Sequence, residues 1–226
     1  MVKPNKNKFL RRWILSNMVS LFGAGLFGWV FAAIGILSIQ ASQGSSTTQG
    51  NGTVLISLFG LLTGLVLGLA QWDVLRLQLP RLGGWLLVTT LGTVTGGLIL
   101  QTLLFEPMRG IRGLFTAFGP VVLFWTGLGF WLGLWQARLL KPYLKRWPLW
   151  ILASGTGTLL ASEAAFGAIL LFGWFNQRVV ENTGKGEAMP WFISLGWIAT
   201  VPLMMFLPGF VYGWVTSRVL ARLNAL

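Results

Sequence analysis

Six long apolar runs constrain this chain more than any other feature of its sequence. Each run contains about 20 or more mostly apolar residues, the length that an α-helix needs to cross the hydrocarbon core of a bilayer. Backbone polar groups in lipid must bond within their own segment, so the runs are expected to be helices. They span residues 13–39, 53–72, 83–105, 114–136, 148–175 and 191–217. The sequence therefore predicts an all-α integral membrane protein, with six transmembrane helices in a single domain over residues 1–226.

The placement of basic residues predicts the orientation of these helices. Short loops rich in Lys and Arg stay in the cytoplasm. Most of the 17 basic residues lie before the first run or after the second, fourth and sixth: Lys3, Lys6, Lys8, Arg11, Arg12, Arg76, Arg81, Arg138, Lys141, Lys145, Arg146, Arg218 and Arg222. Both termini are therefore expected in the cytoplasm, in a bacterial inner membrane or a thylakoid. The net charge of +12 is interpreted as a signal of topology, with recruitment of anionic lipid or of an acidic partner as the alternative. Membrane lipids are expected partners, and nucleic acid is not.

The composition argues against an enzyme. The chain has no cysteine and no histidine, which removes thiol catalysis, the commonest general base and the commonest metal ligands. It also lacks a phosphate-binding loop and a dinucleotide fingerprint. No catalytic or metal-binding residues are expected. No cofactor is predicted either, although a pigment or a lipid could bind.

The sequence contains three copies of one repeated unit. At a constant offset of 65, Gly68 matches Gly133 and Gln71 matches Gln136, and Gly213 and Thr216 continue the pattern near the C-terminus. The repeats cover about 9–72, 81–137 and 146–217, each a pair of helices that begins and ends on the cytoplasmic side. Parallel repeats are related by an axis along the membrane normal. We therefore expect a pseudo-threefold bundle, or alternatively a six-helix bundle in which the repeats no longer pack symmetrically.

Small residues at a spacing of four mark the packing faces of the predicted helices. Helices in lipid associate through close backbone contact at such faces, because the tails around them are as apolar as leucine. The aligned positions in the three even-numbered runs are Gly64, Gly68, Gly129, Gly133, Gly209 and Gly213. Their common register predicts helix-packing seams.

Polar residues and tryptophans follow these seams. Gln71, Gln136 and Thr216 are expected either to hydrogen-bond across helices or to form a polar ring around a cytoplasmic vestibule. Tryptophans near the helix ends are expected to anchor the interface, with the ring buried and the indole N–H in water. They are Trp13, Trp72, Trp85, Trp135, Trp147, Trp150 and Trp214.

Glu163 interrupts the apolar pattern in the middle of the fifth run. The equivalent positions in the other repeats are Leu26 and Leu98. A carboxylate at this depth costs several kcal/mol unless it is paired or protonated, so it is a candidate functional residue. Its expected partners are nearby hydroxyls, those of Ser162, Thr156 or Thr158, or a backbone carbonyl freed near a proline. It either donates one interhelical hydrogen bond or holds a proton or cationic substrate during transport.

Prolines mark a second candidate site. Pro202 and Pro208 lie inside the sixth run, and Pro120 lies early in the fourth. Proline removes a backbone hydrogen bond and kinks a helix. The freed carbonyls can line a binding site in a transporter, or the kink can serve packing alone.

One motif carries a resemblance. G-x-x-Q-W is followed by L-R, a basic residue and a tryptophan that opens the next helix, at Gly68, Gln71, Trp72, Leu75, Arg76, Arg81 and Trp85. A degenerate copy occupies Gly133, Gln136, Arg146 and Trp150. The pattern resembles that of uncharacterised small polytopic membrane proteins of cyanobacteria and related bacteria, a resemblance that implies no activity.

Two functions are compatible with these features. The dense seams and the scarcity of reactive groups favour a non-enzymatic accessory subunit that packs against other membrane proteins, lipids or pigments, or against a second copy of itself. The parallel repeats, Glu163 and the proline-broken sixth helix favour a transporter of a small solute or ion instead.

Overall fold

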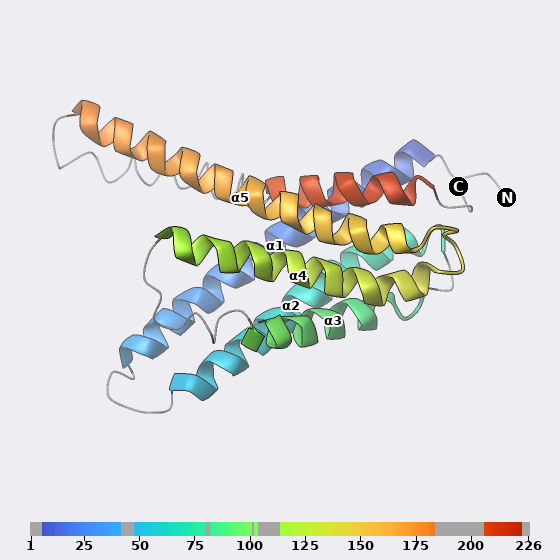
Figure 1. The fold of residues 1–226 in the computed structure, drawn as a ribbon, viewed down its shortest axis with the longest axis horizontal. Coiled ribbons are helices and arrows are strands. Elements are labelled where there is room, and N and C mark those ends of the chain that lie inside the picture. The colour runs from blue at the N-terminus through green and yellow to red at the C-terminus, as the bar shows by residue number, and fades with distance from the viewer. Residues whose placement is uncertain are drawn as a thin grey trace.

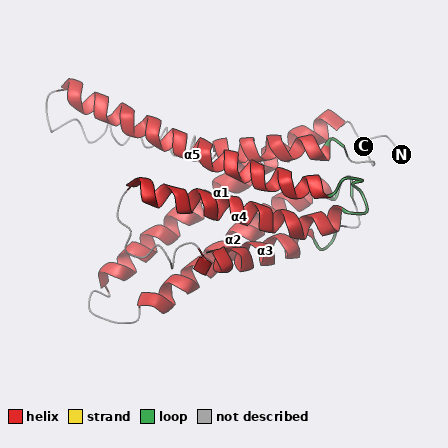
Figure 2. Cartoon of the chain, in the orientation of Figure 1, coloured by secondary structure: helices red, strands yellow, loops and turns green. Residues whose placement is uncertain are grey.

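The protein is all-α over the residues that its structure, a computed structural model, describes: 6–41, 48–79, 82–100, 102–103, 114–183 and 206–222. These residues form helices and the turns between them, with no strand (Figure 2). The helices are α1 (Lys6–Ala41), α2 (Thr48–Leu75), α3 (Trp85–Leu100), α4 (Leu114–Leu140), α5 (Pro148–Thr183) and a sixth helical segment at 206–220. The predicted all-α class is confirmed, and the N-terminal part of the sixth run lies outside the described residues.

The helices run along a common direction and reverse from one to the next (Figure 1). Both chain ends lie at the same end of the molecule, where short turns join α2 to α3 and α4 to α5. Each of the five named helices packs against the next along the chain. Segment 206–220 contacts α5 through Ser154 and Tyr212, and contacts α1 through Trp13 and Thr216. The last helix therefore meets the first, and the six helices form a closed ring.

Two helical segments are long and apolar enough to cross a membrane, among the residues described: Ser57–Leu75 and Pro148–Phe175. The apolar helix Trp85–Leu100 is shorter. Length and composition thus support a membrane association, while six crossings and the orientation stay predictions.

The glycine seams join each even-numbered helix to the odd-numbered helix that follows it. A Cβ added to Gly64 of α2 would lie 2.7 Å from the Thr90 Cα of α3. One added to Gly133 of α4 would lie 3.0 Å from the Ile151 Cα of α5. These distances leave no room for a side chain, so the backbones touch.

The same contact closes the ring. A Cβ on Gly213 would lie 3.0 Å from the Ile14 Cα of α1, and one on Gly209 would lie 2.5 Å from the Met18 Cα. Ile14 of α1 therefore contacts Gly213 in the same way that Ile151 of α5 contacts Gly133 of α4. The tightest pairs are α2 with α3, α4 with α5, and segment 206–220 with α1, so the third pair is assembled from the two ends of the chain.

Candidate functional site

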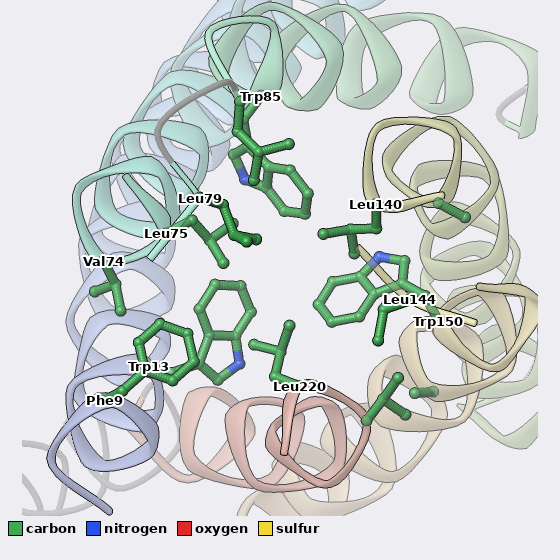
Figure 3. Packing of buried hydrophobic residues seen from close by; sticks show 14 residues of the cluster. Phe9, Trp13, Val74, Leu75, Leu79, Trp85, Leu140, Leu144, Trp150 and Leu220 are labelled. Carbon is green, nitrogen blue, oxygen red and sulfur yellow. The ribbon is translucent and has the colours of Figure 1, made fainter. Parts of the chain in front are cut away.

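Three tryptophans fill the centre of the bundle at the end where the chain termini lie. Trp13, Trp85 and Trp150 are 0% exposed, and Figure 3 shows their rings pointing toward a common centre. The ring centroids of Trp150 lie 5.9 Å from those of both Trp13 and Trp85, in edge-to-face geometry. Leu75, Leu140 and Leu220 are equally buried around them. The expectation that these three tryptophans anchor an interface is wrong, because their indole N–H groups have partners inside the protein.

The first of these partners is Gln71 on α2. Its Oε1 accepts a hydrogen bond from Trp85 Nε1 at 3.2 Å, and its Nε2 donates one to Asn17 Oδ1 at 2.8 Å. Asn17 Nδ2 in turn donates to the backbone oxygen of Trp13 at 2.8 Å. One glutamine therefore links α1, α2 and α3.

Gln136 on α4 repeats this arrangement. Its Oε1 accepts from Trp150 Nε1 at 3.1 Å, and its Nε2 donates to Thr89 Oγ1 at 3.0 Å. Its Nε2 also lies 3.5 Å from Gln71 Oε1, so the two glutamines touch. Gln136 thus links α3, α4 and α5, just as Gln71 links α1, α2 and α3.

A threonine and a tyrosine take the glutamine's place in the third copy. Thr216 Oγ1 accepts from Trp13 Nε1 at 2.9 Å and donates to the Tyr212 backbone oxygen. The shorter threonine cannot also reach α5, and the Tyr212 hydroxyl does so instead, at 3.2 Å from Ser154 Oγ. We call Gln71, Gln136 and Thr216, with their partners, the polar ring.

The members of the polar ring are buried and bonded across helices, so they do not line an open vestibule. Sequence analysis missed Asn17, Thr89, Ser154 and Tyr212. The first three occupy equivalent positions of the three repeats and are all 0% exposed. Their polar character at one aligned position was the signal that could have identified them.

An apolar cavity of about 390 Å³ adjoins the polar ring, on the side away from the termini. All six helices contribute to its wall. Leu67, Leu132 and Tyr212 occupy equivalent positions nearest the polar ring, and Thr63, Leu128 and Pro208 lie one turn further. The cavity therefore lies at the centre of the helix ring.

Most hydroxyls in the cavity wall are bonded to their own helix. Thr93 donates to the Thr89 carbonyl, Thr158 to the Ser154 carbonyl and Ser162 to the Thr158 carbonyl. Thr63 differs, because its hydroxyl has no partner among the described residues and the residue is only 4% exposed. Among the fully buried polar atoms of the described wall, the Thr63 hydroxyl is therefore the one without a partner.

Glu163 lies on the exposed face of α5, next to Ser162 but not in the cavity wall. Its three expected hydroxyl partners donate instead to carbonyls of α5, with Thr156 bonding the Leu152 oxygen at 2.6 Å. No described residue forms a hydrogen bond or an ion pair with the carboxylate. The sequence located Glu163 on the helix but not the direction in which it points.

The three candidate prolines of the sequence lie in different parts of the chain. Pro208 lies in segment 206–220 and lines the cavity. Pro120 lies inside α4. Pro202 lies outside the described residues.

Three other tryptophans are partly exposed, at the end where the termini lie. Each has an arginine over its ring: Arg76 on Trp72 at 4.9 Å, Arg138 on Trp135 at 4.8 Å, and Arg218 on Trp214 at 4.5 Å. Such pairs suit the boundary between hydrocarbon and headgroups.

The described residues contain no group of carboxylates, histidines or cysteines arranged to hold a metal ion. Comparison with known proteins adds no candidate chemistry. No family model, no curated protein and no solved structure matches the chain.

Proposed function

We propose that this protein is a six-span integral membrane protein with pseudo-threefold symmetry and cytoplasmic termini, and that it acts as a non-enzymatic accessory subunit. It packs against lipids and against another membrane protein. The recurrence of the glycine contacts and of the tryptophan–acceptor bonds in three helix pairs supports the symmetry. The apolar exterior of α5, with Leu160, Leu170 and Leu171 exposed, supports the membrane location.

The closed interior supports a packing role over a conducting one. The three central tryptophans and the three leucines around them fill the bundle at one end, and the polar ring lies directly behind them. A solute that moved along the central axis would have to displace the tryptophans, each of which is held by a hydrogen bond from its indole N–H, and the leucines packed around them. Buried networks of this kind are rigid when they are fully satisfied.

The outward position of Glu163 is the observation that carries the proposal. A carboxylate that faces hydrocarbon at the middle of a helix costs several kcal/mol unless a donor or a cation satisfies it. The described residues supply neither. A polar or basic side chain of a neighbouring transmembrane helix would satisfy it, so the partner is placed on this face of α5.

Purification from the native membrane in a mild detergent tests this proposal. The wild type is expected in a particle heavier than one chain, with a second protein present. Glu163→Leu, the residue of the other two repeats, should release the partner, while Glu163→Gln should retain part of it because an amide still hydrogen-bonds. Leu160→Ala, on the same exposed face, is the control. A particle of one chain or a simple homo-oligomer, unchanged by Glu163→Leu, would contradict the accessory role.

The cavity favours a second candidate, a transporter of a small solute or ion. In that case Glu163 carries the coupling proton or cation. Glu163→Gln should then abolish coupled uptake into proteoliposomes while the protein stays folded. Unchanged uptake in this variant would exclude the role of Glu163 in transport.

A further inference from the structure

We infer that the central cavity holds one uncharged hydrocarbon tail, from a membrane lipid or from an isoprenoid, with a hydrogen-bond acceptor at the depth of Thr63. The inference rests on the membrane location proposed above, and adds a ligand at a site distinct from the partner-binding face of α5.

The cavity wall is mostly apolar and suits an apolar occupant better than a polar one. A buried water needs two to four polar partners. The hydroxyl protons of Thr93, Thr158 and Ser162 are already bonded to helix carbonyls, the Ser154 and Tyr212 hydroxyls bond each other, and no charged residue is among the described wall residues. An empty cavity costs stability in proportion to its volume. An apolar chain is the occupant that this wall accommodates.

The dimensions of the cavity fit a chain. Its wall on α5 runs from Ser154 to Ile169, which corresponds to a rise of about 22 Å at 1.5 Å per residue. One leaflet of the hydrocarbon core is about 15 Å thick. A volume of about 390 Å³ equals roughly a dozen water-sized groups. The cavity therefore extends along several turns of α5 and is bounded at one end by Ser154 and Tyr212 of the polar ring.

Thr63 supplies the second, independent observation. Its hydroxyl is buried without a partner, whereas the equivalent wall residues are Leu128 and Pro208. A threonine side chain in a helix populates two rotamers, so its hydroxyl can turn toward the cavity. One ester carbonyl or alcohol oxygen on the occupant would satisfy it.

The test compares two neighbouring alanines of α5. Ala165 lines the cavity and Ala164 does not, so Ala165→Phe fills the site and Ala164→Phe is the matched control. Each protein is purified from native membranes, and the lipid that remains bound is extracted and identified by mass spectrometry. We expect about one molecule per chain for the wild type and Ala164→Phe, and a loss of at least fivefold for Ala165→Phe. The mass of the molecule tells a glycerolipid from an isoprenoid.

A second measurement keeps the inference falsifiable if Ala165→Phe does not fold. Monoolein, which has one acyl chain and an ester carbonyl, is added to delipidated protein and the melting temperature is recorded. The wild type should be stabilised, and Thr63→Val should be stabilised less while melting normally without monoolein. No bound lipid in the wild type, equal retention in Ala165→Phe, or equal stabilisation of Thr63→Val would overturn the inference. A wild-type protein that purifies with its lipid but without a partner protein would instead contradict only the accessory role.

Discussion

At the scale of single residues, the protein is organised around polar side chains that each satisfy two neighbours. Gln71 and Gln136 accept from a tryptophan with the oxygen and donate to an adjacent helix with the nitrogen. A carboxamide accepts with its oxygen and donates with its nitrogen, so it can bond groups on two different helices at once. The full burial of the indoles depends on these acceptors, since a buried N–H without a partner is costly.

Gln136→Leu is expected to destabilise the protein. The substitution leaves the Trp150 N–H and the Thr89 hydroxyl without their partner, and each unsatisfied buried group costs about 1–3 kcal/mol. Thr156→Val is the control, because Thr156 is exposed and bonds only its own helix. Thermal unfolding in detergent measures both. Equal melting temperatures for the two variants would show that the polar ring does not hold the helices together.

The sequence could predict that these polar residues matter, but not how they are used. Gln71, Gln136 and Thr216 align at one position, which identifies them as a set. Tyr212 aligns with Leu67 and Leu132, and nothing in that alignment indicates that its hydroxyl replaces a glutamine nitrogen. The interfacial role predicted for Trp13, Trp85 and Trp150 failed because a tryptophan near a helix end suits a wet boundary or a buried acceptor equally well.

At the scale of helices, glycines determine which pairs approach most closely. The four-residue spacing predicted a packing face on each helix, and the structure adds which neighbour that face contacts. The spacing of small residues within one helix indicates which of its faces packs closely. It contains no information about which helix lies against that face.

Gly64→Ala is expected to push α2 away from α3. Its Cβ would lie 2.7 Å from the backbone Cα of Thr90, which cannot move without the whole helix, and overpacking of this kind costs about 1–3 kcal/mol. Gly167→Ala in α5 is the matched control, because a Cβ there meets no atom within 4 Å. Thermal unfolding should show a lower midpoint only for Gly64→Ala. A loss of the same size in Gly167→Ala would mean that flexibility, and not contact, explains the glycines.

At the scale of the whole molecule, the first and last helical segments pack together and close a ring, although they lie near opposite ends of the chain. The pair formed by segment 206–220 and α1 has the contacts of the pairs α2–α3 and α4–α5, without a connecting turn. The sequence repeat predicted three like units. It could not predict the central cavity, because a cavity depends on how side chains from all six helices meet.

A circular permutant is expected to fold. The new chain begins at Arg146, ends at Lys145 and joins residue 222 to residue 6 by a short flexible linker. The cut lies between two exposed residues of a turn, and the linker replaces a connection that the other two pairs already have. Size-exclusion chromatography in detergent should give the same elution volume as the native order. If the permutant aggregates at every linker length tested, the result would argue that the ring is not closed.

Closure of the ring around the cavity is the central claim, and cysteine cross-linking in native membranes tests it most directly. The chain has no cysteine of its own, so an introduced pair reports alone. Phe22 of α1 and Phe206 stack with ring centroids 4.4 Å apart, whereas Val19 of α1 is 61% exposed. With a short bifunctional thiol reagent, we expect rapid intramolecular cross-linking in Phe22→Cys/Phe206→Cys and none in Val19→Cys/Phe206→Cys. Cross-links that form only between chains, or equally in both variants, would contradict the closed ring.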